Sequence, residues 1–379
     1  MNIALFFLSF LIVAFGQPAY IGWLGAIAAA FGYGMIFKTL LEIPKRKKKF
    51  WMGSAWFFAV QLVQLYWFLS HPYAYIYPFY FFLCAVLGAQ FGLVCTYVTR
   101  KNISSTRGIL GIGSLWVLLE WVRLFVLSGF SFNPIGIALT ANIYSLQVAS
   151  IGGVYLLSLL VIITNLLALN MWEKRFSFQS TALWGIVLVA PYIYGVYHFH
   201  SHSQAASFHA DSEQQMKAVL VQTAFPAEEA LGIESQAEFI AYVFDEWSQI
   251  LKITKRHLDK ETDLIVLPEF VVPLGTYTFV YPYTLVKEAF AKHYGEDSLE
   301  SLPPLELPFA RKFDTEMGTE YFVNNAFWSQ AIANRFDAPI LLGLEDVDEH
   351  EDGKRNYYSA ALMLKPQQSL SAEEISASL

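Results

Sequence analysis

Long apolar runs dominate the first half of this chain. Runs close to the thickness of a bilayer recur at residues 3–16, 19–41, 51–70, 74–98, 108–128, 151–172 and 180–198. A transmembrane helix needs about 20 predominantly apolar residues. The pattern therefore predicts a polytopic α-helical membrane bundle of about seven spans over residues 1–200, with a short first span.

The loops between these runs differ in charge. Basic residues gather in three of them: Lys45, Arg46, Lys47, Lys48 and Lys49, then Arg100, Lys101 and Arg107, then Lys174 and Arg175. The alternate loops, around residues 71–78 and 129–150, contain neither Lys nor Arg. By the positive-inside rule the basic loops are cytoplasmic. We expect a multi-pass inner-membrane protein with a cytoplasmic N-terminus and an extracytoplasmic segment after residue 200.

The periodicity changes after a polar stretch at 201–215, which we expect to be a linker. Short apolar runs at 217–222, 263–267, 340–344 and 357–364 predict strands, and residues 234–257 and 326–336 have helical spacing. Strands that alternate with helices are typical of an α/β layered domain. We expect such a domain over residues 216–379.

Residues 271–325 form a stretch that is too long for an ordinary connection. It contains Tyr277, Phe279, Tyr281 and Tyr283 in alternation. This pattern fits either a strand or an aromatic arm that touches lipid, so we expect a functional loop or arm.

Composition and charge support the division into two parts. Only 15% of the residues are charged, against about 25% in soluble domains. Residues 1–200 hold 12 Lys and Arg against three acids, and residues 201–379 hold 13 against 29, a net charge of −16. An acidic domain repels phosphate, which argues against nucleic-acid binding. The only cysteines, Cys84 and Cys95, lie in one apolar run and predict no disulfide framework.

Glu269 is the leading candidate for acid–base chemistry. It follows the buried strand predicted at 263–267, and α/β folds place their sites at the carboxyl ends of strands. Partial shielding from water there would suit a general base. The alternative is a solvated acid at the end of a strand.

Glu120 and Arg123 share a helical face within the fifth apolar run. Charges within a membrane are costly and are functional candidates by default. Arg123 could hold a lipid phosphate, or the two could form a structural ion pair. The alternating His198, His200 and His202 would suit a metal only on a strand, so we expect unstructured histidines and no metal site.

Two motifs together with the predicted topology resemble the bacterial apolipoprotein N-acyltransferase family, membrane-embedded enzymes with an outward nitrilase-like domain. One is Leu264-Ile265-Val266-Leu267-Pro268-Glu269-Phe270. The other is Glu120-Trp121-Val122-Arg123 followed by Gly129-Phe130-Ser131-Phe132, which is similar to the family's E-W-x-R and G-F-P-W runs. Ser131 stands where the family has Pro, Phe132 where it has Trp, and Tyr358 where it has Asn.

The resemblance implies an α-β-β-α sandwich and a Glu-Lys-Cys triad in which Glu269 is the general base. It also implies that Glu120, Arg123, Gly129, Phe130 and Phe132 serve the lipid substrate. The family's catalytic Lys and Cys have no counterpart here, since Lys365 comes too early and the two cysteines lie in a span. We therefore expect a chain truncated before both residues, with an incomplete nitrilase-like domain.

The implied reaction transfers an acyl chain from a phospholipid, through a thioester on the enzyme, to the N-terminal diacylglyceryl-cysteine amine of a lipoprotein. It needs no cofactor; its partners are the phospholipid donor, the diacylated apolipoprotein and the bilayer. We expect the chain alone to be inactive. The alternatives are a catalytically inactive membrane protein, or another membrane-bound nitrilase-like amidase or lipid-dependent transferase.

Overall fold

The computed structural model describes residues 2–71, 73–126, 129–210, 216–223, 232–233, 235–259, 261–315, 318–349 and 354–367. The chain divides into two compact units, Met1–Asp211 and Ser212–Leu379.

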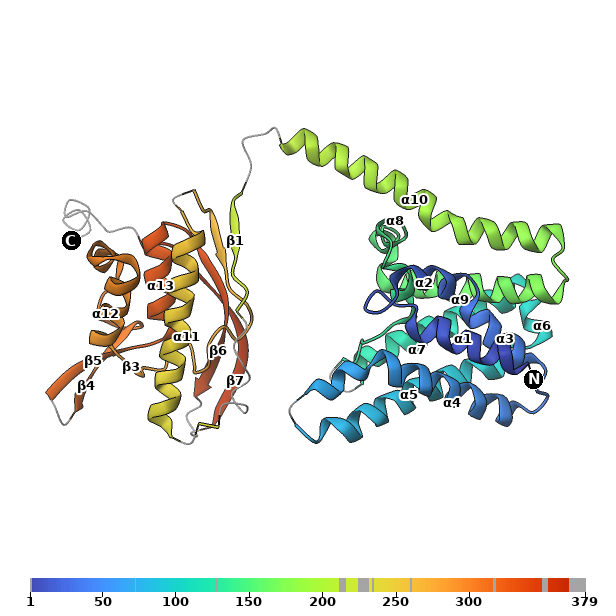
Figure 1. The fold of residues 1–379 in the computed structure, drawn as a ribbon, viewed down its shortest axis with the longest axis horizontal. Coiled ribbons are helices and arrows are strands. Elements are labelled where there is room, and N and C mark those ends of the chain that lie inside the picture. Colours follow the sequence, from blue (N-terminus) through green and yellow to red (C-terminus); the bar gives the residue numbers. More distant parts are fainter. Residues whose placement is uncertain are drawn as a thin grey trace. The chain divides into compact units, whose positions relative to one another are not determined.

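The first unit is a bundle of helices (Figure 1). Five of the described helical segments are long and apolar enough to cross a membrane: Gly22–Leu41, Ile76–Tyr97, Thr106–Phe125, Ala149–Glu173 and Phe178–Gln204. The chain is thus a multi-pass membrane protein by helix length and composition. The helices are α1 (Ile3–Phe15), α2 (Gly22–Ile27), α3 (Tyr33–Leu41), α4 (Arg46–Gln64), α5 (Ile76–Tyr97), α6 (Arg100–Ile103), α7 (Thr106–Val122), α8 (Ile143–Leu146), α9 (Ala149–Glu173) and α10 (Phe178–Ala210).

Shorter turns complete the bundle. A π-helical turn, η1 (Ala28–Gly32), joins α2 to α3, and 3-10 turns η2 (Tyr66–Ser70), η3 (Arg123–Phe125) and η4 (Ile135–Leu139) follow α4 and α7. The sequence predicts seven apolar runs, and two of them form helices outside the five. The α1 helix has only 13 residues, and α4 begins with four basic residues, Arg46 to Lys49.

Close packing of small residues and rings holds the bundle together. A Cβ atom at Gly92 of α5 would lie 2.0 Å from Ser54 Oγ and 2.6 Å from the Phe50 carbonyl of α4. Any larger residue at position 92 would therefore push these two helices apart. Beside this contact the rings of Phe57 and Phe91 stack with their centroids 4.9 Å apart.

The α10 helix corrects two expectations. Residues 201–210, expected to be part of a linker, continue α10 as far as Ala210, while 211–215 lie outside the described residues. The histidines expected to be unstructured are helical instead. His198 Nδ1 lies 2.9 Å from Gln147 Oε1, and His202 Nε2 lies 3.0 Å from His198 Nε2. Helical spacing puts positions 198 and 202, but not 200, on one face.

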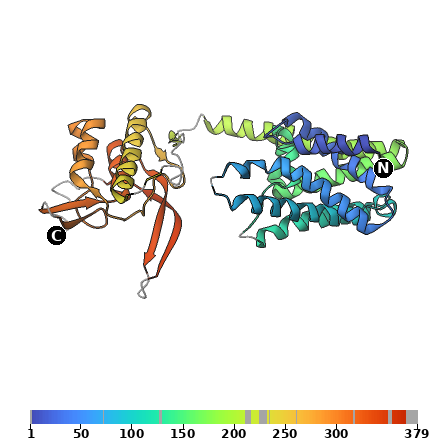
Figure 2. The ribbon, with the colours of Figure 1, turned by 60° about the horizontal axis from the view of Figure 1, so that its bottom comes forward.

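The second unit contains a four-stranded sheet of order β1-β2-β6-β7. Strands β1 (Ala218–Leu220), β2 (Leu264–Val266) and β6 (Ile340–Glu349) are parallel, and β7 (Arg355–Leu364) pairs antiparallel with β6. The β6–β7 pair forms a long hairpin that extends past the helices (Figure 2). The predicted strands at 217–222, 263–267, 340–344 and 357–364 all lie in this sheet.

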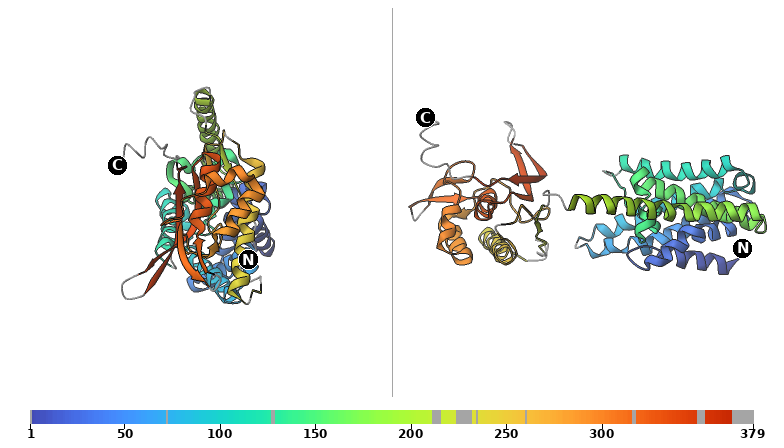
Figure 3. Two further views of the ribbon diagram at one scale, coloured as in Figure 1. Left: turned by 90° about the vertical axis from the view of Figure 1, so that its left-hand side faces the viewer. Right: turned by 90° about the horizontal axis from the view of Figure 1, so that it is seen from above.

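Two helices pack on one face of this sheet, α11 (Gln236–His257) and α13 (Asn325–Phe336) (Figures 1 and 3). Alternate residues of the strands point into this core, among them Ile265, Leu342 and Leu344. Trp247 of α11 stacks on Trp328 of α13 with ring centroids 5.6 Å apart.

The opposite face of the sheet carries an exposed apolar row. Leu220, Val266, Leu341 and Met363 lie opposite one another in register across the four strands. Leu220 is 76% exposed and Met363 is 54% exposed. The described residues therefore cover one face of this sheet with helices and leave apolar side chains open on the other.

The segment 271–325, expected to be a functional loop or arm, consists largely of regular elements. This segment forms β3 (Tyr281–Pro282), α12 (Tyr283–Tyr294), the 3-10 turn η6 (Glu296–Ser301), β4 (Ala310–Thr315) and β5 (Gly318–Val323). The three strands make a second sheet of order β3-β5-β4. Of the alternating aromatics, Tyr281 is fully buried in β3 and the centroid of the Tyr283 ring lies 6.0 Å from that of Phe327, whereas Tyr277 is 44% exposed.

Candidate functional site

Glu269 lies in a tight turn that follows β2 and runs against β6. The Gly343 N–H donates to the Pro268 carbonyl at 3.1 Å, and the Val271 N–H donates to the Gly343 carbonyl at 3.0 Å. A Cβ atom at Gly343 would lie only 2.5 Å from the Glu269 Cα. Position 343 therefore has room for no side chain while the turn stays in place.

The Glu269 side chain is exposed, contrary to the expected partial shielding, because the turn lifts it off the sheet. Ser359 Oγ donates to Glu269 Oε1 at 2.9 Å. Ser359 pairs in register with Glu345 of β6. Since antiparallel partners share a face of the sheet, Ser359 and Glu345 lie on the side that the Glu269 turn crosses.

A polar pocket of about 430 Å³ adjoins this cluster. One wall is the segment from Leu274 to Thr278, and the other is formed by the β6–β7 hairpin at Glu345, Val347 and Tyr357. The Thr276 N–H and Oγ1 both donate to the Glu345 carbonyl at 2.7 Å and so fix the first wall to the second.

Asn325, at the start of α13, also fixes the pocket wall that begins at Leu274. Its Nδ2 donates to the carbonyls of Pro273 (3.2 Å) and Leu274 (3.1 Å). Its Oδ1 accepts from Trp247 Nε1 (2.9 Å) and the Tyr281 hydroxyl (2.8 Å). Burial raises the pKa of Tyr281, so its hydroxyl keeps the proton that it donates.

Sequence reasoning missed Asn325, Ser359 and Gly343. The pair Asn324-Asn325 before a helical run signals a helix start, and Asn324 does cap α13 through a bond from the Phe327 N–H. Nothing in the spacing indicates that the second Asn binds a loop 50 residues earlier.

The second candidate lies at the end of α7 in the bundle. Glu120 is 2% exposed, and its Oε1 accepts from Trp116 Nε1 (2.8 Å) and from the Ile135 N–H (2.9 Å). Arg123 is 5% exposed; its Nη2 lies 3.7 Å from Glu120 Oε1, and its Nη1 donates to the Phe132 carbonyl at 3.2 Å. The two side chains form an ion pair that holds the chain from 132 to 135.

The motif Gly129-Phe130-Ser131-Phe132 begins this held segment. Gly129 has a φ of +92°, which a residue with a side chain rarely adopts. Phe130 is buried, and its ring lies 5.4 Å from that of Phe132. Phe132 is half exposed, and the centroid of its ring lies 5.7 Å from that of Trp67. It therefore belongs to an aromatic cluster of the η2 turn.

Behind this segment lies a buried amide network that sequence reasoning also missed. Asn133 Nδ2 donates to Gln61 Oε1 (2.7 Å) and Gln64 Oε1 (2.8 Å), and Gln17 Nε2 donates to Asn133 Oδ1 (2.5 Å). The sequence signal that could have indicated this network is the pair Gln61 and Gln64, which lie three residues apart in an otherwise apolar run. The network fixes the backbone that follows the motif.

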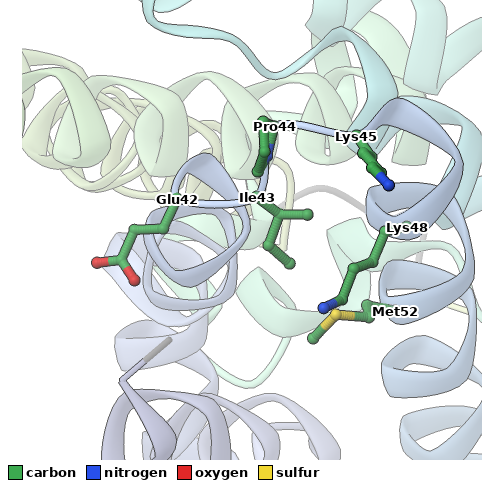
Figure 4. Close-up of a pocket in the computed structure, with 6 residues that line it drawn as sticks. All are labelled: Glu42, Ile43, Pro44, Lys45, Lys48 and Met52. Carbon is green, nitrogen blue, oxygen red and sulfur yellow. The ribbon is translucent and has the colours of Figure 1, made fainter.

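A hollow of about 530 Å³ lies in the bundle where α3 ends and α4 begins (Figure 4). Lys48 and Met52 of α4 line it together with Lys45, and the Glu42 carboxylate points away from both lysines. Because the Glu42 carboxylate faces neither of these two lysines, we assign this hollow no catalytic role.

Comparisons with known proteins relate the chain to one enzyme family. Residues 4–167 match the family model described as the apolipoprotein N-acyltransferase N-terminal domain. The apolipoprotein N-acyltransferase of Chlamydia pneumoniae is 26% identical over 371 residues, which cover 96% of this chain and 62% of that protein. That of Chlamydia caviae is 28% identical over 369 residues, 94% of this chain and 61% of that protein. That of Rickettsia prowazekii is 36% identical over 83 residues, 21% of this chain and 17% of that protein. The chain spans about three-fifths of the length of the chlamydial proteins.

Proposed function

Because the chain belongs to the apolipoprotein N-acyltransferase family, we propose that it serves the transfer of a phospholipid acyl chain to lipoproteins. The acceptor is the N-terminal diacylglyceryl-cysteine amine, and the acyl chain passes through a thioester on the enzyme. A phospholipid donor, a diacylated apolipoprotein and the bilayer are then its partners.

The position of Glu269 is the observation that carries this proposal. It is an exposed carboxylate at the carboxyl end of β2, oriented by Ser359 and placed by the close approach of Gly343. A free thiol has a pKa of about 8.5, so a thiol nucleophile needs a nearby base at neutral pH. Glu269 supplies that base: it takes the thiol proton as the sulfur attacks the acyl ester.

The nucleophile is not one of this chain's own thiols. Cys84 and Cys95 are both fully buried within α5. Neither can attack an ester without unpacking the bundle. The chain taken alone therefore forms no acyl-enzyme.

The held segment after α7 serves the lipid donor. The buried Arg123 guanidinium donates to the carbonyl of Phe132, whose half-exposed ring contacts Trp67, so a lipid that packs on these rings would lie next to the charge beneath them. Among the described residues, nothing accepts a hydrogen bond from the buried Arg123 Nε. Glu120, Gly129 and Phe130 position this segment and do not themselves touch the phosphate.

The proposal includes a location. Seven spans, with α1 and α4 added to the five long helices, put the basic loops on the cytoplasmic side of the inner membrane. The unit from residue 212 onward is then periplasmic and forms part of a nitrilase-like α-β-β-α sandwich. The open apolar row of Leu220, Val266, Leu341 and Met363 supports a sandwich, since a second layer would bury it.

A phospholipid with a radiolabelled acyl chain tests both substrate and chemistry. In nanodiscs the chain should retain the lipid without covalent labelling, and Arg123→Gln should reduce retention severalfold while Arg175→Gln does not. Covalent label on the chain would disprove the statement about the nucleophile. Equal retention by Arg123→Gln would remove Arg123 from the donor site.

The buried cysteines favour one alternative, a protein that binds lipid without turnover. This alternative also predicts that the chain retains lipid. Unlike the proposed acyl transfer, it predicts that Glu269→Gln leaves every cellular readout unchanged.

A further inference from the structure

A second pocket in the bundle lies at the end of α7 opposite to Arg123. It has a volume of about 490 Å³ and lies where α7 and α10 begin and α9 ends. The 17 residues of α7 place Thr106 about 25 Å from the Arg123 end at the usual helical rise. This pocket is therefore separate from the candidate site at Glu120 and Arg123.

The pocket has an apolar body and a polar mouth. Its walls come from three helices: Ile109 and Leu110 of α7, Leu160 and Ile163 of α9, and Leu183 and Val187 of α10. Its polar lining residues are Ser104, Ser105, Thr106, Asn170, Lys174, Gln179 and Ser180. Such a gradient along one cavity matches a molecule with a polar head and a hydrocarbon tail.

The mouth is electropositive for two reasons. Lys174 is exposed at the end of α9 and carries a full charge. The first turns of α7 and α10 also meet the pocket, and the N-terminus of a helix carries a partial positive charge. No acidic side chain lines the described part of the pocket. The mouth therefore favours an anionic headgroup.

The surroundings supply such a molecule. Only 11% of the apolar window of α10 is buried within the chain, so most of its surface faces lipid when the bundle lies in a membrane. A lipid can then enter from the side with its chain still in the bilayer. The mouth lies in the region of the basic loops, near the level of headgroups.

We propose that this pocket binds one anionic glycerophospholipid as a fixed component of the bundle. An acyl chain lies between Ile163 and Leu183, and the phosphate lies against Lys174 and the two helix starts. This lipid is distinct from the acyl donor, because it lies at the other end of α7. It joins α10 to α7 and α9.

Native mass spectrometry of the whole chain, released from nanodiscs, tests the headgroup. The probes are phosphatidylglycerol and phosphatidylcholine with identical chains. The wild type should retain one phosphatidylglycerol in preference to phosphatidylcholine. Lys174→Gln should weaken phosphatidylglycerol binding about fivefold, as the loss of one basic contact predicts, while Lys101→Gln should not. Equal retention of both lipids, or equal losses in the two variants, would overturn the anionic site.

A matched pair on α10 tests the position of the acyl chain. Leu183→Trp fills the pocket, whereas Ile186→Trp adds the same ring at a position that is 66% exposed and outside the lining. We expect the first variant to lose the bound lipid and the second to keep it, with equal helix content by circular dichroism. Retention in Leu183→Trp would place the lipid elsewhere and overturn the proposal.

Discussion

Gly343 and Glu269 depend on each other at the scale of single residues. The Glu269 backbone crosses β6 at Gly343, which has no side chain. A Cβ atom at position 343 would lie 2.5 Å from the Glu269 Cα. The proposed base can take this position because residue 343 of the neighbouring strand has no side chain. Among the described residues, the Glu269 side chain accepts a hydrogen bond from Ser359.

Replacing Gly343 by Ala should displace the Glu269 turn. Forcing an extra methyl into a packed site costs about 1–3 kcal/mol, and the turn, in which Glu269 and Phe270 are exposed, should move before β6 does. Ala361→Ser, at the exposed partner of Gly343 in register on β7, is the control. Hydrogen exchange at residues 267–273 measures the effect; unchanged exchange in Gly343→Ala would show that the contact is not restrictive.

His293 makes the stability of the second unit depend on pH. Burial, and then the charges of Lys292, Lys255 and Lys252, lower the pKa of His293, whose Nε2 lies 2.8 Å from Ser248 Oγ. The unfolded chain therefore takes up a proton more readily than the folded unit. The contribution of His293 is complete above its ordinary pKa of 6.5 and is lost as the pH falls through the lowered value.

Hydrogen exchange of α11 and α12 between pH 8 and pH 5 measures this dependence. We expect the wild type to lose protection on acidification, and His293→Gln to lose less of it. His257→Gln, at an exposed histidine of α11, is the control. A wild type and a His293→Gln variant with the same pH dependence would contradict the assignment.

At the scale of elements, regular patterns were predictable and tertiary contacts were not. All four runs predicted as strands lie in one sheet, because buried strands need unbroken apolar runs. The alternating aromatics of segment 271–325 fit either a strand or an arm, and the sequence could not decide between them. Tyr281 lies in strand β3 and is buried because it donates to Asn325 of α13, whereas Tyr277 stays exposed.

The candidate sites divide in the same way. Glu269 could be found because its position follows from a local strand pattern, and Glu120 and Arg123 because charge within an apolar run is conspicuous. Their partners come from distant segments: Ser359 lies 90 residues after Glu269, and the Ile135 N–H lies 15 residues after Glu120. Periodicity carries no information on such contacts.

The segment after α7 should loosen when Glu120 is replaced. Glu120→Ala removes the acceptor of the Trp116 and Ile135 bonds and leaves Arg123 buried without its counter-ion. Breaking a buried ion pair costs about 3–5 kcal/mol. We expect faster exchange at residues 129–139 and a lower unfolding temperature in nanodiscs.

An exposed position on the same helix gives the matched control. Leu118 of α7 is 55% exposed, so Leu118→Ala should change neither quantity. If Glu120→Ala behaved like Leu118→Ala, the pair would not hold the segment, and its proposed role in positioning Arg123 would be wrong.

At the scale of the whole molecule, the charge of the loops predicts orientation. Because Cys84 and Cys95 are buried, a membrane-impermeant maleimide should react only with introduced thiols. In intact spheroplasts Ser70→Cys and Glu261→Cys should react, and Lys101→Cys only after permeabilisation. The reverse pattern would invert the topology and exclude a periplasmic second unit.

The whole account predicts that Glu269 is required for acylation of lipoproteins. The most direct test expresses the gene from its full genomic locus in cells depleted of their own lipoprotein N-acyltransferase. Mass spectrometry of the N-terminal peptide of a lipoprotein then distinguishes the diacylated from the triacylated form. We predict triacylated peptide with the wild-type gene and only diacylated peptide with Glu269→Gln at equal protein levels. Triacylation that persists in Glu269→Gln would contradict the account.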